Sequence, residues 1–446
     1  MRKYIFVIIS IFSLSSSAQN IYSGYHSNAF ILNLNSNPAS FPEAKTIIGF
    51  PALSHFSLGL QSPLSFNELF EKGEDDSLRL DIPSVPSFLG NKDALLLNAR
   101  NQLFYLGFKV GKKKKIFVYL GDEIVADVCL KLSNNIVNYL THGNAQFLNR
   151  QMNFKDERLD MSVYNSLYIG ASSSVTDKLN IGTRIKLLNG IANVFTETLN
   201  LDFYTDSTSI PIFQTTILAD YDILTSGLTS SPDPLLNSGF AIDLGASYKY
   251  NKKFEFSFAL NDLGSINWAL ENNEFYTTEG ESEFVIDGLT ESSSTDDNLD
   301  IQLEEILDSL ATIMGPIKTT GSYNTNLNPS VYLGIAYKLN KRHSFSLLFH
   351  SRKNLDSFLN VLNLGYQFQV AESLELLGSY QNFNGLRNLG TGFVWSPGVF
   401  QMHLILDNIL VSDLFDAKNL FLQLGFSLQF GKKPNIKKTR KKIGLR

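Results

Sequence analysis

The chain has 446 residues and a formal net charge of −5, and 43% of its residues are hydrophobic. After its first residues no stretch approaches about 18 uninterrupted apolar residues, which excludes helical membrane spans. A single cysteine, Cys129, excludes a disulfide framework and lies too far from the N-terminus to be acylated there. With 34 Phe and 18 Tyr, the chain is either a large soluble β protein or a membrane β-barrel.

Residues 1–18 have the features of a cleavable signal peptide. Basic residues precede the short apolar run Ile5–Phe12, and small residues at Ser16 and Ala18 follow in the spacing that signal peptidase recognises. The run is too short to span a bilayer as a helix, which needs about 20 residues. We therefore expect residues 1–18 to be removed and the mature chain to be exported.

Residues 19–44 form a polar segment between the expected cleavage site and the first strand. It contains Asn37, Pro38, Ala39 and Ser40, a combination of a stiff proline with residues that favour turns. We expect the segment to fold on the periplasmic side into the mouth of the lumen, because a wide barrel leaves space that its own side chains do not fill. A disordered leader is the alternative.

Residues 45–430 alternate between apolar and polar side chains with the period of β-strands. In Ser238–Gly264, aromatic and aliphatic residues occupy one face and small or polar residues the other, on both sides of a short turn. The same pattern recurs at Ser330–Phe349. Six such hairpins, with an opening strand near Lys45–Leu60 and a closing strand at Asn419–Phe430, bring the predicted number of strands to fourteen.

Even strand numbers, short periplasmic turns and longer external loops are typical of outer-membrane barrels. All six predicted tight turns lie on one side. The other side carries four long connections, at about 61–100, 126–160, 203–237 and 268–328. We therefore predict an all-β fold, a closed antiparallel transmembrane β-barrel located in the outer membrane, with short helices in the extracellular loops.

A soluble β-sandwich or a barrel with a dry core is the alternative fold. Its polar face would meet solvent and should be rich in Lys, Glu and Thr. Here the polar face carries Gly, Ala, Ser, Asn and Gln, and the apolar face stays aromatic to the strand ends, as an interfacial belt requires. The pattern therefore favours a barrel whose apolar face contacts outer-membrane lipid.

Seven strands carry a glycine on the polar side, a few residues before a tight turn or the end of the last strand. These inward glycines are Gly107, Gly170, Gly245, Gly334, Gly365, Gly390 and Gly425. A ring without side chains near the periplasmic mouth would let another backbone approach closely, so we predict that the N-terminal segment packs there. The alternative is that these glycines ease strand coiling as the barrel closes.

Two further segments suggest a periplasmic or surface protein partner. Asn298–Met314 has apolar residues at helical spacing, which predicts an amphipathic helix that packs on the barrel or offers a docking surface. The tail, residues 431–446, carries eight basic residues and no acidic one. The basic residues are Lys432, Lys433, Lys437, Lys438, Arg440, Lys441, Lys442 and Arg446. This basic tail could contact anionic lipid headgroups, peptidoglycan or a periplasmic protein. The alternative is a solvated tail without a partner. Because the chain is exported, nucleic acid is not an expected partner.

No constellation of residues indicates an enzyme, a metal site or a cofactor. The six histidines are scattered without the spacing of metal ligands, and no G-x-S-x-G motif is present. The lysines of "GFKVGKK" are better explained as a solvated hairpin turn than as a phosphate loop. The alternative is that the chain is an enzyme with a nucleophile in the lumen or at the barrel rim, as in outer-membrane lipases.

The tripeptide Asn37-Pro38-Ala39, shortly before the first strand, resembles a signature of FadL-type outer-membrane barrels and of the Bacteroidota barrels PorV and PorP/SprF associated with type IX secretion. Together with the "SSSAQ" signal end and the hairpin Leu167–Val194, it most resembles an uncharacterised Bacteroidota family of that superfamily. The resemblance implies fourteen strands with an N-terminal plug in the lumen, and no particular substrate.

Two functions are consistent with these features. The first is a plugged membrane platform, or a component associated with envelope or type IX secretion machinery, and the sequence slightly favours it. The second is a FadL-like passive transporter of hydrophobic or small amphipathic solutes. A sealed lumen would favour the platform, and an apolar pocket that joins the loops to an opening in the wall would favour transport. The sequence names no partner or solute and gives no oligomeric state.

Overall fold

The computed structural model describes residues 24–27, 30–72, 78–80, 94–111, 115–131, 133–136, 138, 147–155, 157–208, 214–228, 233, 235–278, 282–286, 317–354, 357–383, 386–407 and 418–431. The expected signal peptide, the expected helix Asn298–Met314 and the tail from Lys432 onward lie outside these residues. Among the described residues, no helix is both long and apolar enough to cross a membrane.

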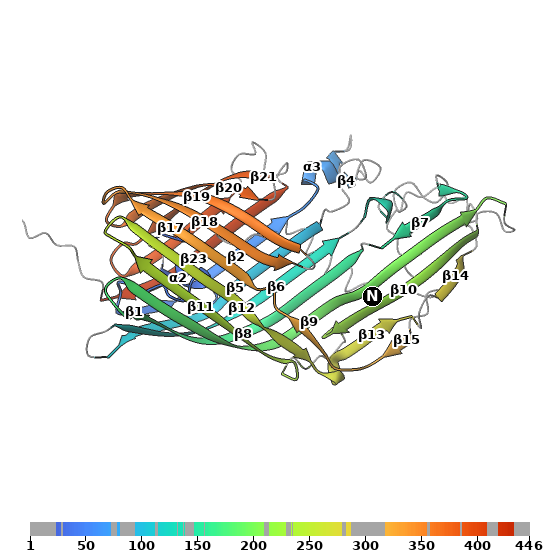
Figure 1. Ribbon diagram of the computed structural model, residues 1–446, viewed down its shortest axis with the longest axis horizontal. Coiled ribbons are helices and arrows are strands. Elements are labelled where there is room, and N and C mark those ends of the chain that lie inside the picture. The colour runs from blue at the N-terminus through green and yellow to red at the C-terminus, as the bar shows by residue number, and fades with distance from the viewer. Residues whose placement is uncertain are drawn as a thin grey trace, which may run out of the picture.

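Within this described part, fourteen antiparallel strands close into one barrel (Figure 1). The last strand pairs back onto the first, so the barrel has no open edge. In order of pairing, the strands are β1 with β2 (Thr46–Gly49 and His55–Gln61), β5 (Ala94–Val110), β6 (Ile116–Lys131), β8 (Arg158–Ser174), β9 (Leu179–Asp206), β11 (Ser238–Lys249), β12 (Phe254–Trp268), β17 (Ser330–Lys338), β18 (His343–Asn354), β19 (Ser357–Ala371), β20 (Leu374–Phe383), β21 (Leu386–Trp395), β22 (Phe400–Asp407) and β23 (Asn419–Phe430). The predicted fold is confirmed, including the bounds of the closing strand.

Side chains along the barrel strands alternate between the lumen and the outer surface. On β17 the side chains of Tyr332 and Ala336 are buried, whereas those of Leu333 and Ile335 are 47% and 38% exposed. The other barrel strands expose Phe, Leu, Ile and Tyr in the same way. A continuous apolar surface of this kind is what lipid acyl chains require of a barrel exterior. The chain therefore has the architecture of an outer-membrane β-barrel.

We predict that Leu333→Lys lowers the free energy of unfolding by about 2–4 kcal/mol, the cost of a lysine on the lipid face near the middle of a bilayer. The measurement is urea unfolding of the protein in lipid vesicles. Leu235→Lys is the matched control, because Leu235 is 76% exposed in the turn before β11, outside the strands. Equal stability of the two variants would contradict the assignment of Leu333 to the lipid face.

The opening strand is interrupted halfway. β1 ends at Gly49 and β2 begins at His55, and between them Pro51, Ala52 and Leu53 bulge from the wall with exposed side chains. Proline cannot donate to a sheet ladder, while the N–H groups of Ala52 and Leu53 donate to backbone carbonyls at 2.7 and 3.1 Å. The expectation of one continuous strand is therefore wrong here, and hydrogen bonds replace the lost ladder.

Beyond the rim opposite the tight turns, the sheet continues as an external extension (Figure 1). The outer half of β9 pairs with β7 and β10, β10 pairs with β13 and β14, and β13 pairs with β15. The bounds are β7 (Gln151–Phe154), β10 (Gln214–Ser226), β13 (Asn273–Thr277), β14 (Ser282–Ile286) and β15 (Ile317–Thr319). Residues 203–237 and 268–328 thus connect neighbouring barrel strands as expected, but they also contain strands, which the sequence pattern did not predict. The buried alternation of Ile217, Ala219 and Tyr221 against β9 explains why β10 is a strand.

The remaining described elements are short. α2 lies in the lumen, whereas α3 and β4 lie on the side of the barrel that carries the long connections (Figure 1). On that side β3 pairs with β4, β16 pairs with the end of β12, and η3 follows β12 directly. Their bounds are α2 (Phe30–Ser36), α3 (Phe66–Leu69), β3 (Phe70–Lys72), β4 (Leu78–Leu80), η3 (Leu270–Asn272) and β16 (Tyr323–Asn326).

Candidate functional site in the lumen

The N-terminal segment (residues 24–27 and 30–45) lies inside the barrel. Its helix α2 buries Leu34 in a cluster with aromatic residues of the wall, among them Tyr105, Phe117 and Tyr119. The chain then turns at Asn37, where the N–H of Ser40 donates to the Asn37 carbonyl at 3.0 Å. It finally leaves the lumen to enter β1, where the N–H of Lys45 donates to the Phe430 carbonyl at 2.8 Å. The segment therefore occupies the half of the lumen nearest the tight turns.

Asn37 connects this segment to the wall. Its side-chain amide donates to the hydroxyl of Tyr25 and to the backbone carbonyls of Ala246 and Phe258, at 3.2, 3.4 and 3.2 Å. Its side-chain oxygen accepts from the N–H of Ala39 at 2.9 Å. Asn37 is 5% exposed. A single asparagine thus orders the turn and joins it to β11 and β12, which a proline-containing loop could not do through its backbone alone.

Two glycines of the wall accommodate the Asn37-Pro38-Ala39 turn. A side chain at Gly245 would collide with the Asn37 side chain and the Ala39 N–H, and one at Gly182 would collide with the carbonyl of Pro38. Gly245 belongs to the predicted inward glycines, whereas Gly182 does not. The signal for Gly182 was its polar-side position on β9, opposite Gly245 in the register.

The other predicted glycines meet different partners. A side chain at Gly334 would meet Tyr25 and His26 of the N-terminal segment, in addition to Ser257. Side chains at Gly107 and Gly170 would collide with Phe117 and Tyr119 of the wall. Side chains at Gly365 and Gly425 would collide with Ser346 and with His403 respectively, and Gly390 is buried. Gly245 and Gly334 of the predicted set therefore face the N-terminal segment.

His26 lies at the same interface and is neutral at pH 7. Burial, and to a smaller extent the charge of Lys338, lowers the pKa of His26 to about 4. Its ring packs edge-on against Tyr25 with centroids 4.7 Å apart. Its Nε2 atom has no hydrogen-bond partner within the described structure.

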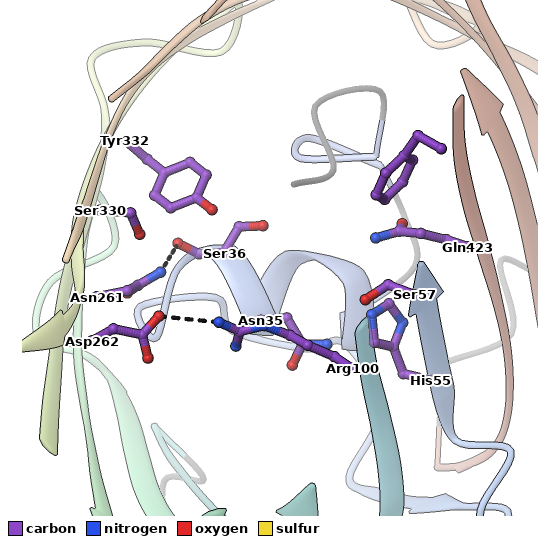
Figure 2. A pocket seen from close by; sticks show the side chains of 11 residues that line it. Asn35, Ser36, His55, Ser57, Arg100, Asn261, Asp262, Ser330, Tyr332 and Gln423 are labelled. Atoms are coloured by element: carbon purple, nitrogen blue, oxygen red, sulfur yellow. Dashed lines mark hydrogen bonds and ion pairs between the residues drawn. The ribbon is translucent and has the colours of Figure 1, made fainter. Parts of the chain in front are cut away.

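Next to the N-terminal segment, on the side of the long connections, a layer of charged side chains lies in the lumen. Asp243 of β11 pairs with Arg184 and, at 3.0 Å, with Lys186, both on β9. Lys186 also pairs with Asp262 of β12. From a distant strand, β5, Arg100 reaches the same Asp262 at 3.2 Å (Figure 2). These five residues, which we call the charged layer, join β5 to β9, β11 and β12.

A β-bulge places Asp262 in the charged layer. Strict alternation along β12 points Asn261 into the lumen and Asp262 out of it. The register shifts between Ile242 and Leu244, so that Asp243 alone faces both Asn261 and Asp262. Asp262 has a φ of 62°, and its N–H donates to the carboxylate of Asp243 at 2.7 Å. The bulge turns both side chains inward, which the sequence pattern did not predict.

Two cavities flank this layer. The smaller, about 30 Å³, lies between the N-terminal segment and the wall and is lined by Asn35, His55, Arg100 and Gln423 among others (Figure 2). The larger, about 280 Å³, lies on the loop side and is lined by residues of β5, β6, β8, β9, β16, β18 and β19. Its lining combines apolar side chains, such as Leu96 and Leu327, with paired charged ones. We call it the outer cavity.

Among the residues that the structure describes, no three or more His, Cys, Asp or Glu side chains gather in a way that could hold a metal ion. His55 and His403 do meet, with ring nitrogens 3.5 Å apart. Their contact fits a hydrogen bond between two neutral imidazoles, one donating and the other accepting.

Comparison with known proteins gives one family and several similar structures. The model of a family of unknown function, DUF5723, matches residues 38–407. The toluene transporter TbuX of Ralstonia pickettii is similar at 10% identity, with 94% of this chain and 96% of that chain covered and a TM-score of 0.44. A FadL homologue of Pseudomonas aeruginosa is similar at 10% identity, with 93% and 96% covered and a TM-score of 0.45. No curated protein matches the sequence.

Proposed function

The chain belongs to the DUF5723 family, and from the geometry of its lumen we propose that it is a passive channel for small amphipathic solutes. The observation that supports this most is the outer cavity, whose lining combines apolar, polar and charged side chains. Concave sites whose lining joins apolar side chains with placed polar groups are typical of small-molecule binding. Passive transport, rather than the membrane platform, is therefore the function that we propose.

Passage through the barrel requires the N-terminal segment to move as a plug. Its docking leaves polar atoms buried without a partner in the described structure, namely the side-chain oxygen of Asn33, both amide atoms of Asn35 and the Nε2 of His26. Asn35 also lines the smaller cavity, which has room for a water molecule. The interface of the plug is therefore partly polar, and displacement of the plug exposes groups that water can hydrogen-bond.

The platform function depends on two other segments of the chain. The basic tail from Lys432 onward lies outside the described residues. So does most of the connection 268–328, which carries thirteen Asp or Glu residues. An association with envelope or type IX secretion machinery through these segments therefore stays a prediction from the sequence.

The test is uptake into liposomes that contain the purified protein. Four solutes share one apolar body and differ in charge: leucyl-phenylalanine, its N-acetyl derivative, its amide, and the N-acetyl amide. We expect the protein to accelerate uptake of at least one of them over empty liposomes. Failure with all four would contradict the proposed function.

Cys129 offers a direct test of the route. It lines the outer cavity and is the only cysteine of the chain. We predict that a bulky maleimide attached to Cys129 lowers protein-dependent uptake to the level of empty liposomes, because it fills the cavity. Cys129→Ala is the matched control and should transport normally with and without the reagent. Unchanged uptake at complete labelling, measured by mass spectrometry, would place the route elsewhere.

A further inference from the structure

The outer cavity contains two ion pairs among apolar side chains. Arg352 of β18 reaches across the lumen to Asp127 of β6, with Nη2 and Oδ2 2.8 Å apart. On β8, Arg158 pairs with Asp160 through Nε and Oδ2 at 3.1 Å. All four residues line the outer cavity.

These four charges are partly buried. The side chains of Arg352 and Asp127 are 14% and 16% exposed, and those of Arg158 and Asp160 are 22% and 21% exposed. Asp127 also accepts from the side-chain amide of Asn98. A solute that enters the cavity must therefore compensate charges of both signs, because a buried charge without a partner is costly.

Apolar side chains also lie close to these charges, beside neutral polar ones such as Asn98 and Thr325. Leu96 and Cys129 form a buried cluster with Leu359 packed against it. The guanidinium of Arg158 lies 5.5 Å from the ring centroid of Phe195. The cavity thus offers cations, anions and apolar surface within one volume of about 280 Å³.

We propose that the outer cavity selects zwitterionic amphipathic solutes, namely apolar amino acids or short apolar peptides with free termini; this inference rests on the proposed channel function. The carboxylate of such a solute pairs with Arg352 or Arg158, and its ammonium group pairs with Asp127 or Asp160. Its apolar side chain contacts Leu96, Leu327 or Leu359.

Other charge types match the cavity less well. An anion would satisfy an arginine and leave the displaced aspartate unpaired, and a cation would do the reverse. An uncharged solute would desolvate both ion pairs without replacing their water. Lys353 also lines the cavity but is exposed, so solvent screens its charge.

The volume of the outer cavity also agrees with a solute of this size. A cavity of about 150 Å³ accepts benzene, and the outer cavity, at about 280 Å³, has room for a larger molecule.

The experiment measures binding and uptake of the same four solutes. Leucyl-phenylalanine should bind roughly 10- to 100-fold more tightly than its N-acetyl derivative or its amide, since each lacks one charge-assisted pairing. The doubly blocked N-acetyl amide should bind most weakly. Tighter binding of any blocked solute, or equal binding of all four, would overturn the inference. If the binding preference is absent or reversed but the protein still accelerates uptake of a blocked solute, the channel function stands and only the zwitterion selectivity fails.

Two sets of variants separate recognition from folding. The double variant Arg352→Gln with Asp127→Asn removes one ion pair without leaving a single charge, and should reduce the preference for leucyl-phenylalanine about tenfold or more. Lys115→Gln with Asp177→Asn removes an exposed pair at a periplasmic turn and should leave the preference unchanged. Heat-modifiable migration in gel electrophoresis shows that each variant is folded. An unchanged preference in a folded Arg352/Asp127 variant would overturn the inference.

Discussion

Gly245→Leu is expected to release the N-terminal segment from the lumen. A side chain at this position meets the Asn37 side chain and the Ala39 N–H, and overpacking of this kind costs about 1–3 kcal/mol. That cost corresponds to a roughly 5- to 150-fold larger population of the displaced segment. The measurement is the rate at which an added protease cleaves within residues 37–45, because this rate follows the population of the opened state when reclosure is fast.

Gly378→Leu is the matched control for this prediction. Gly378 is also a strand glycine, but a side chain added to it meets nothing within 4 Å. Its neighbours Leu376 and Tyr380 are exposed on the outside, so the new leucine faces lipid. Cleavage should be as slow as in the unmodified protein. A protected segment in Gly245→Leu, in a barrel that still shows heat-modifiable migration, would mean that the turn is not held by this contact.

The barrel itself was predictable because its signal is local and repeated. Alternation with period two decides which side chains face lipid and which face the lumen, and every hairpin repeats it. The closing strand therefore has the bounds expected from its sequence, and Leu333 and Tyr332 lie on the expected faces. Tight turns and inward glycines follow from the same alternation.

Features that depend on a break in the alternation were not predictable in this way. The bulge at Asp262 changes the face of one residue, and only its partner strand reveals the shift in register. The bulge of the wall at Pro51 interrupts a strand that otherwise has the expected pattern. At Asp262 the shift is accompanied by a hydrogen bond to Asp243 of the partner strand. At Pro51 the missing N–H is a local signal, but the alternation of side chains does not contain it.

The candidate site is even less local. Arg100 and Asp262 are separated by 162 positions in the sequence and Arg352 and Asp127 by 225. Charged residues on the polar face of a strand indicate a wet lumen, but they do not say which of them will meet across it. The charged layer and the outer cavity therefore required the closed barrel, whereas the place of Asn37 near Gly245 could be anticipated from an inward glycine and a nearby turn.

Asp243→Asn is expected to destabilise the barrel strongly, because Asp243 is completely buried and pairs with both Arg184 and Lys186. Lys186 keeps Asp262, whereas Arg184 loses its carboxylate, and an unpaired buried charge costs about 3–5 kcal/mol. Urea unfolding in lipid vesicles measures this loss. Adding Arg184→Gln should restore a large part of the stability, since no buried cation is then left alone. Asp177→Asn, at an exposed ion pair, should change nothing measurable. If the double variant were as unstable as Asp243→Asn, shape rather than charge would hold this layer together.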